Sequence, residues 1–243
     1  MMNKVNVLGV NFDNYSFEEF QNELISRINN HLSTFIVTAN PEIVMLARDN
    51  KNFKNIINNE ADYVTADGIG IVLAGKMQKT PIQERVTGYD LFTWLLDVAN
   101  LRKLRVYLIG AKPEVIKAVE EKINLKYPQI ELVGCEDGYF KDDLNTVADR
   151  IRNKKPDMVF AAIGFPRQEE LISILRRQKL PAVMMGVGGS FDVFSGQTKR
   201  APEVFQRAHL EWFYRLVTEP TRIKRMMVLP EFVIEVQKNK HKK

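Results

Sequence analysis

Two loops of the chain combine small and polar residues directly after short apolar runs. One loop, GVGGSFD at residues 186–192, follows the apolar run 182–185. The other, GFPRQE at residues 164–169, follows the apolar run 158–163. Glycine lets a backbone approach a ligand without a Cβ in the way, and an acid such as Asp192 just past a strand suits a ribose or sugar hydroxyl. The pair of loops therefore predicts a small-molecule site, although either loop alone is also typical of an ordinary strand-to-helix turn.

The elements that must position these loops alternate between strands and helices. Apolar runs that predict strands occur at residues 5–10, 34–38, 63–65, 105–109, 131–133, 158–163 and 182–185. Stretches with helical spacing lie between most of them; the first begins with the capping-box pattern Ser16-x-x-Glu19. Repeated βα units of this length predict an α/β fold, a Rossmann-like parallel sheet with helices on both faces.

The pattern changes beyond Gly196. Pro202 can open a helix with apolar residues at every fourth position, and a second piece follows Pro220 with no strand near it in the sequence. We therefore expect an α/β catalytic domain over residues 1–195 and a basic helical appendage over residues 196–243. The appendage carries eleven basic and five acidic residues, a net charge of +6, whereas residues 1–195 carry 24 basic and 25 acidic ones. This asymmetry predicts an anionic partner for the tail, and nucleic acid, anionic lipid and a diphosphate substrate all fit it.

Composition indicates an ordinary soluble globule, with 45% hydrophobic and 27% charged residues. The one cysteine, Cys135, excludes an internal disulfide and fits a reducing compartment. The first thirteen residues contain too short an apolar run for a signal peptide, and no window is apolar enough for a spanning helix. We therefore expect a cytoplasmic protein.

Several kinds of chemistry are excluded or weakened by missing motifs. The chain has no G-x-x-x-x-G-K-[ST] phosphate loop, and the turn at residues 110–113 lacks the G-x-G-x-x-G of dinucleotide-binding proteins. His31, His209 and His241 are scattered, so neither a zinc site nor a Ser-His-Asp arrangement is indicated. No D-x-D pair is present, so cationic side chains would have to replace a metal if a diphosphate leaves. We expect no cofactor and no metal.

Polar residues also follow the ends of the predicted strands. Thr38 and Asn40 end one strand, Asp67 follows another, and the two loops at 164–168 and 188–192 follow two more. In open α/β sheets, ligands bind beyond the carboxyl ends of the strands. This convergence favours a binding site over a purely structural role.

At this point the chain resembles a known family. The motifs TANPE (38–42), ADG (66–68), ERVTG (84–88), IGFPRQE (163–169), GVGGSFDVFSG (186–196) and RAPE (200–203) occur in that order. Together they resemble the WecG/TagA/CpsF family of bacterial glycosyltransferases over nearly the whole chain. The resemblance implies an inverting, metal-independent transferase. Members similar to TagA move N-acetylmannosamine from UDP to C4 of the GlcNAc in GlcNAc-diphosphoundecaprenol, the step that builds the linkage unit of wall teichoic acid. Members similar to WecG use the mannosaminuronic acid donor.

The resemblance also assigns roles to residues near the acceptor sugar, each with a structural alternative. Asp67 is the candidate general base for the acceptor hydroxyl; a helix N-cap is its alternative. Thr38 and Asn40 would hydrogen-bond a sugar, although Asn40 could equally cap the helix that begins at Pro41. Gln168 would reach a sugar or phosphate from a first helical turn, or it would be a solvated residue there.

The remaining candidates concern the nucleotide, the lipid and the membrane. For the donor nucleotide the candidates are Gly164, Pro166, Gly188, Gly189 and Asp192. Arg85 would grip the lipid diphosphate, with a surface salt bridge to Glu84 or Glu42 as its alternative. In the tail, Arg215, Arg222 and Arg225 would meet a diphosphate or the membrane surface, beside an apolar anchor at residues 226–229.

The partners expected are therefore UDP-N-acetylmannosamine, a polyprenyl-diphosphate-linked GlcNAc acceptor and the inner face of the cell membrane. Nucleic acid is not expected, because no aromatic residues interleave with the basic ones. A non-catalytic nucleotide-sugar-binding module and a nicotinamide-dependent oxidoreductase remain alternatives, and the sequence leaves the choice of donor and a homo-oligomer open.

Overall fold

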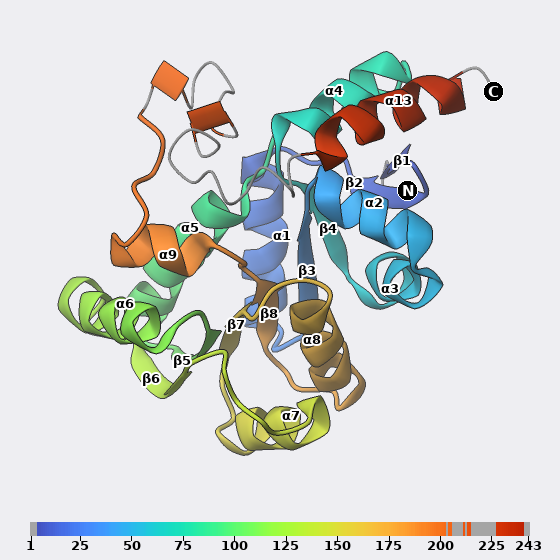
Figure 1. The fold of residues 1–243 in the computed structure, drawn as a ribbon. Coiled ribbons are helices and arrows are strands. Elements are labelled where there is room, and N and C mark those ends of the chain that lie inside the picture. Colours follow the sequence, from blue (N-terminus) through green and yellow to red (C-terminus); the bar gives the residue numbers. More distant parts are fainter. Residues whose placement is uncertain (1–3, 203, 206–210, 212, 215–226, 241–243) are drawn as a thin grey trace.

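A computed structural model describes residues 4–202, 204–205, 211, 213–214 and 227–240 of the chain. Within these residues, parallel strands form one sheet in the order β4-β3-β8-β7-β5-β6 (Figure 1). The strands are β3 (Thr34–Ala39), β4 (Tyr63–Ala66), β5 (Arg105–Gly110), β6 (Glu131–Glu136), β7 (Met158–Ala162) and β8 (Val183–Gly186). The predicted α/β class with a parallel sheet is confirmed.

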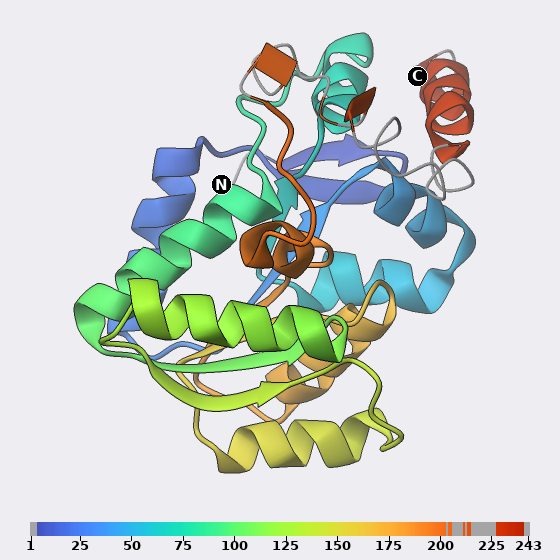
Figure 2. The same cartoon turned by 60° about the vertical axis from the view of Figure 1, so that its left-hand side comes forward.

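Helices cover both faces of the sheet, as the repeated βα units predict (Figures 1 and 2). One face is covered by α1 (Phe17–Asn29), α5 (Gly88–Arg102), α6 (Pro113–Lys126) and α9 (Ser190–Ser195). The other is covered by α2 (Pro41–Asp49), α3 (Lys51–Asn55), α4 (Ile69–Met77), α7 (Leu144–Asn153) and α8 (Arg167–Arg177), with a π-helical turn, Ile56–Glu60, after α3. Each face has its own core of buried apolar side chains, because strands enclosed on both sides by helices bury both sets of side chains.

Local sequence explains where these helices start. The capping box predicted at Ser16 is present: the Ser16 hydroxyl accepts a hydrogen bond from the Glu19 N–H at 3.1 Å, and the Ser16 N–H donates to the Glu19 carboxylate at 2.7 Å. At α5, the Thr87 hydroxyl accepts from the Asp90 N–H at 3.1 Å. Such caps satisfy N–H groups that have no partner within a helix, and they fix the residue at which it begins.

The N-terminal strand predicted over residues 5–10 is wrong. The chain instead forms an antiparallel hairpin of β1 (Lys4–Val7) and β2 (Val10–Asp13) outside the parallel sheet. Leu8 and Gly9 both have positive φ, at 49° and 89°, as a tight two-residue hairpin turn requires. The hairpin is joined to the main sheet by the buried Asp13, whose carboxylate accepts from the Val64 N–H at 2.8 Å.

The described part of the tail ends in helix α13 (Val228–Lys240), which packs against α2 and α4 (Figure 1). Phe232 and Val236 of this helix are buried in the core of that face. Val228 is partly buried against this core and Met227 is 67% exposed, whereas Met226 lies outside the described residues. The apolar anchor expected at residues 226–229 stays a prediction. Helical structure agrees with the expected appendage, and the division of the chain at residue 195 stays a prediction. None of the helices in the described ranges is long and apolar enough to cross a bilayer.

Candidate active site

The connections at the carboxyl edge of the sheet change face at β8. The helix that follows β8, α9, packs on one face, whereas α2 and α8, which follow its neighbours β3 and β7, pack on the other. Ligand crevices of open α/β sheets form where successive connections leave on opposite faces in this way. Both loops that the sequence predicts to form a small-molecule site border this edge. Residues 164–169 follow β7, and residues 186–192 begin at the last residue of β8.

Thr38 and Gln168 meet at the end of β8. The Thr38 hydroxyl donates a hydrogen bond to the Gly186 carbonyl oxygen at 3.3 Å. A Cβ on Gly186 would lie 2.5 Å from Nε2 of Gln168, so the glutamine side chain packs directly against that backbone. The structure thus brings together two of the candidates that the sequence placed on separate elements.

Gln168 is buried, with 4% of its surface exposed, so its alternative as a solvated first-turn residue is wrong. Its Nε2 donates to Oε1 of Glu169 at 2.8 Å. Glu169 is 1% exposed, and burial raises the pKa of its carboxyl to about 7. Within the described part of the chain, Gln168 Oε1 and Glu169 Oε2 are buried without a hydrogen-bond partner. Sequence reasoning missed Glu169, since nothing in the motif distinguishes it from an exposed first-turn acid.

Asp67 directly follows β4, which pairs with β3 on the side opposite to β8. Its N–H donates to the Ala39 carbonyl at 3.0 Å, which extends the pairing of β4 with β3. The N-cap of α4 is Gly68, so Asp67 stands one residue before the cap position that its alternative assigns to it.

Gly88, the first residue of α5, packs against both Asp67 and Thr38. A Cβ at this position would lie 2.9 Å from Thr38 Oγ1 and 3.4 Å from Asp67 Oδ2. Only a residue without a side chain lets the start of α5 approach this closely. Sequence reasoning did not single out Gly88, although it ends the motif ERVTG at 84–88.

Asn40 caps a helix, as its structural alternative predicts. Its Oδ1 accepts from the Ile43 N–H at 3.0 Å, and Pro41 follows as the first residue of α2. This use of the side-chain oxygen is sufficient to explain an asparagine at position 40.

Arg85 forms a salt bridge that neither alternative anticipated. Its Nη2 lies 2.7 Å from Oε2 of Glu211 in the tail, in place of the expected surface partners Glu84 and Glu42. Glu84 instead accepts a hydrogen bond from the Phe17 N–H at 2.8 Å. The tail thus contacts the loop that leads into α5.

The candidates for the donor lie along the ends of β7 and β8. Apart from their chain neighbours, none of the residues that the structure describes has a heavy atom within 4 Å of a Cβ built on Gly164 or Gly188, so there is open space beside these two glycines. Pro166 and Gly189 occupy the N-cap positions of α8 and α9. Asp192 is half-buried within α9, and its carbonyl oxygen accepts from the Thr198 N–H at 2.9 Å. The candidates Arg215, Arg222 and Arg225 lie outside the described residues.

Comparison with known proteins identifies the family. A sequence model described as "Glycosyl transferase WecG/TagA/CpsF family" matches residues 5–243. The chain belongs to the WecG/TagA/CpsF family. It is therefore a glycosyltransferase, as the motifs predict, and the non-catalytic and nicotinamide-dependent alternatives are set aside.

Three relatives of this chain carry the same name. A protein of Bacillus spizizenii is 48% identical over 84% of this chain and 79% of its own length, and one of Bacillus subtilis is 43% identical over 89% and 84%. A protein of Staphylococcus aureus is 39% identical over 98% and 94%. Each is named N-acetylglucosaminyldiphosphoundecaprenol N-acetyl-beta-D-mannosaminyltransferase.

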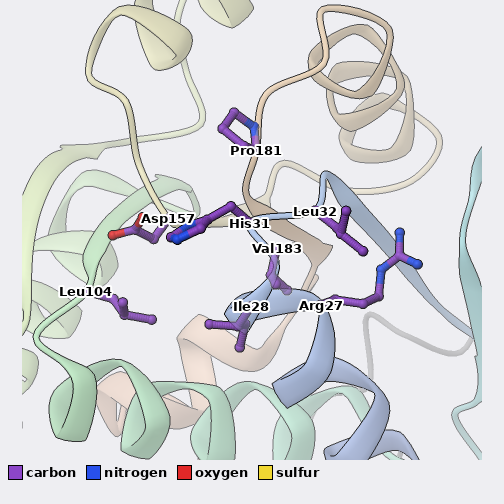
Figure 3. A pocket seen from close by; sticks show the side chains of 8 residues that line it. All are labelled: Arg27, Ile28, His31, Leu32, Leu104, Asp157, Pro181 and Val183. Atoms are coloured by element: carbon purple, nitrogen blue, oxygen red, sulfur yellow. The ribbon is translucent and has the colours of Figure 1, made fainter.

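A small cavity, whose lining side chains are shown in Figure 3, lies at the opposite edge of the sheet from Thr38 and Gln168. Its volume is about 30 Å³, and side chains from the end of α1 and from the amino ends of strands line it, among them His31, Asp157 and Val183. That volume suits about one water molecule and no sugar nucleotide. The cavity therefore takes no part in the site.

The next feature is the arrangement of side chains that could bind a metal ion. Among the residues that the structure describes, no group of three or more His, Cys, Asp or Glu side chains is arranged to hold a metal ion. Charged groups near the start of α5 include Asp67, which packs against Gly88, and the Arg85–Glu211 pair.

Proposed function

We propose that this protein transfers N-acetylmannosamine from UDP-N-acetylmannosamine to the C4 hydroxyl of GlcNAc-diphosphoundecaprenol, in wall teichoic acid linkage-unit synthesis. The observation that carries the proposal is the shared name of relatives that are 39–48% identical to the chain over most of its length. Their name specifies a GlcNAc-diphospholipid acceptor and a beta-linked mannosaminyl product. With an α-linked sugar nucleotide as donor, a beta-linked product means inversion in a single displacement.

A single displacement needs a base at the acceptor hydroxyl, and Asp67 is the carboxylate best placed for it. Its Oδ2 borders the same glycine, Gly88, as the Thr38 hydroxyl. In the proposed mechanism Thr38 orients the acceptor hydroxyl, and Asp67 takes its proton as the oxygen attacks the anomeric carbon.

The donor occupies the open space in front of β7 and β8. Gly164, Gly188 and Gly189 admit the nucleotide, Pro166 shapes the start of α8, and Asp192 binds the ribose. Gln168 presents Oε1, its buried oxygen without a partner among the described residues, to a hydroxyl or N–H group of the sugar. Gln168 has that orientation because Nε2 is held by Glu169.

Cationic side chains stabilise the leaving diphosphate in the proposed mechanism, so the reaction is metal-independent. Arg85 contacts the lipid diphosphate, and Arg215, Arg222 and Arg225 of the basic tail contact a diphosphate or the anionic membrane surface. The enzyme accordingly acts in the cytoplasm, peripherally on the inner face of the cell membrane, where its lipid acceptor lies.

Asp67→Asn tests the role of the base. The amide keeps the size of the side chain and cannot accept a proton, so kcat should fall by about 10²- to 10⁴-fold. Donor affinity, measured by calorimetry, should stay within about twofold, because the base contacts the acceptor. The matched control is Asp97→Asn, the same change at an exposed position of α5, which should leave kcat nearly unchanged. An undiminished kcat in Asp67→Asn would remove Asp67 from the mechanism. An α-linked product, identified by the one-bond carbon–hydrogen coupling constant at the anomeric carbon, would contradict inversion.

A further inference from the structure

A carboxylate of the tail lies between two arginines beside the start of α5. Glu211 Oε2 is 2.7 Å from Arg85 Nη2, and its Oε1 is 4.0 Å from Arg200 Nε. The side chains of Arg85 and Glu211 are only 15% and 21% exposed. An anion is thus held between two guanidinium groups in a partly shielded position.

Arg200 is held in place by other residues. Its Nη2 lies 2.6 Å from Oδ1 of Asp90, and its guanidinium group lies 4.6 Å from the centre of the Tyr89 ring. Asp90 is in turn fixed by the Thr87 hydroxyl, which donates to its Oδ2 at 2.7 Å. Because these contacts do not involve Glu211, Arg200 can keep its position when that carboxylate leaves.

We propose that Arg85 and Arg200 together bind the diphosphate of the lipid-linked acceptor, and that Glu211 occupies this anion site until the diphosphate displaces it. Guanidinium groups bind phosphate oxygens through paired N–H donors in the same way as they bind carboxylates. Of the ordinary protein side chains, a carboxylate most resembles a phosphate in charge and in hydrogen-bond acceptors. The inference rests on the proposed function for the identity of the diphosphate; it adds Arg200 to the site and gives Glu211 a role.

The location suits this acceptor. Arg85 lies three residues before Gly88 in the chain, and Gly88 packs against Thr38 and Asp67. In GlcNAc the reacting C4 hydroxyl lies across the ring from C1, which carries the diphosphate. A diphosphate at Arg85 and Arg200 would therefore leave the C4 hydroxyl about one sugar ring away, on the side of Asp67.

Calorimetric titration with GlcNAc-α-diphosphate carrying a short alkyl chain, without donor and with EDTA, tests the proposal. Glu211→Gln removes the competing charge at constant size and should bind the analogue about fivefold more tightly, which corresponds to the roughly 1 kcal/mol of a strong, partly exposed ion pair. Arg200→Gln should bind it about fivefold more weakly. Glu231→Gln removes another glutamate of the tail that pairs with an arginine of the α/β body, Arg48, and should change nothing. Thermal unfolding of each variant checks that the fold is intact.

The outcomes separate this inference from the proposed function. Unchanged or weaker binding by Glu211→Gln would show that the Arg85–Glu211 pair only holds the tail, and would overturn the proposal. Tighter binding of UDP, and not of the GlcNAc analogue, would assign the cations to the donor and also overturn it. The absence of analogue binding by the wild type would overturn it directly. If the binding pattern holds and no sugar is transferred, the site stands and the proposed reaction fails.

Discussion

The buried carboxyl of Glu169 should make the stability of this protein depend on pH. Its ordinary pKa is 4.5, and burial raises the pKa to about 7. Between these values the unfolded chain has released the proton while the folded chain retains it. The stability that this group contributes is therefore fully present below about pH 4.5 and is lost as the pH rises to about 7. A difference of about 2.5 pKa units at 1.36 kcal/mol per unit corresponds to about 3 kcal/mol.

Glu169→Gln removes the ionisable group and keeps an oxygen that can accept from Gln168 Nε2. The free energy of unfolding of this variant, relative to that of the wild type, should therefore be about 3 kcal/mol higher at pH 8 than at pH 4.5. For a chain of this length that difference corresponds to roughly 6 °C or more in Tm.

Urea unfolding of both proteins at the two pH values measures the difference. Glu121→Gln, on the exposed side of α6, is the control, because it measures the effect of losing one exposed carboxyl on the free energy of unfolding. The same free-energy difference between Glu169→Gln and wild type at both pH values would refute the reasoning, because it would mean that the buried carboxyl titrates as it does in the unfolded chain.

Three further predictions concern the site. Gly88→Ala places a methyl group 2.9 Å from the Thr38 hydroxyl, so kcat should fall about tenfold or more as Thr38 and Asp67 are displaced. Steady-state kinetics that match the wild type would show that the close packing of Gly88 against these residues is unimportant. Asn40→Ala should lower the free energy of unfolding by about 1 kcal/mol through loss of the α2 cap, and Asn40→Ser should restore it; if Asn40→Ser restores stability and transfer remains impaired, Asn40 also binds a sugar. Arg222→Glu should abolish transfer to a lipid acceptor and leave the circular dichroism spectrum unchanged, whereas unchanged turnover would remove Arg222 from the proposed contacts.

Much of the fold could be predicted because each βα unit is encoded locally. The apolar run before residue 164 and the helical spacing after Gln168 specify a strand and a helix without reference to the rest of the chain. The N-terminal hairpin was missed because Leu8 and Gly9 interrupt an otherwise strand-like run by backbone conformation alone. Helical structure in the tail was expected, but the packing of α13 against α2 and α4 was not. Phe232 and Val236 stand four residues apart in the sequence, as one buried helical face requires.

The candidate site could be predicted in outline, because polar residues at the carboxyl ends of parallel strands gather at one edge. The contacts within it could not. The Thr38–Gly186 hydrogen bond depends on β3 and β8 being neighbours, which follows from the strand order and not from either segment. The Arg85–Glu211 pair joins positions 126 residues apart. Glu169 was missed because burial, which makes it unusual, is set by the packing of α8 and leaves no mark on the motif.

Mass spectrometry of the lipid acceptor tests the central claim most directly. Purified protein is incubated with GlcNAc-diphospholipid and UDP-N-acetylmannosamine in excess EDTA, with Asp67→Asn as the matched control. The expected wild-type product is heavier by one N-acetylhexosamine, and the variant should leave the acceptor almost unmodified. An acceptor left unmodified by the wild type, although calorimetry shows that the donor binds, would contradict the proposed acceptor or the metal-independent mechanism, and restoration of transfer by added Mg²⁺ would single out the latter.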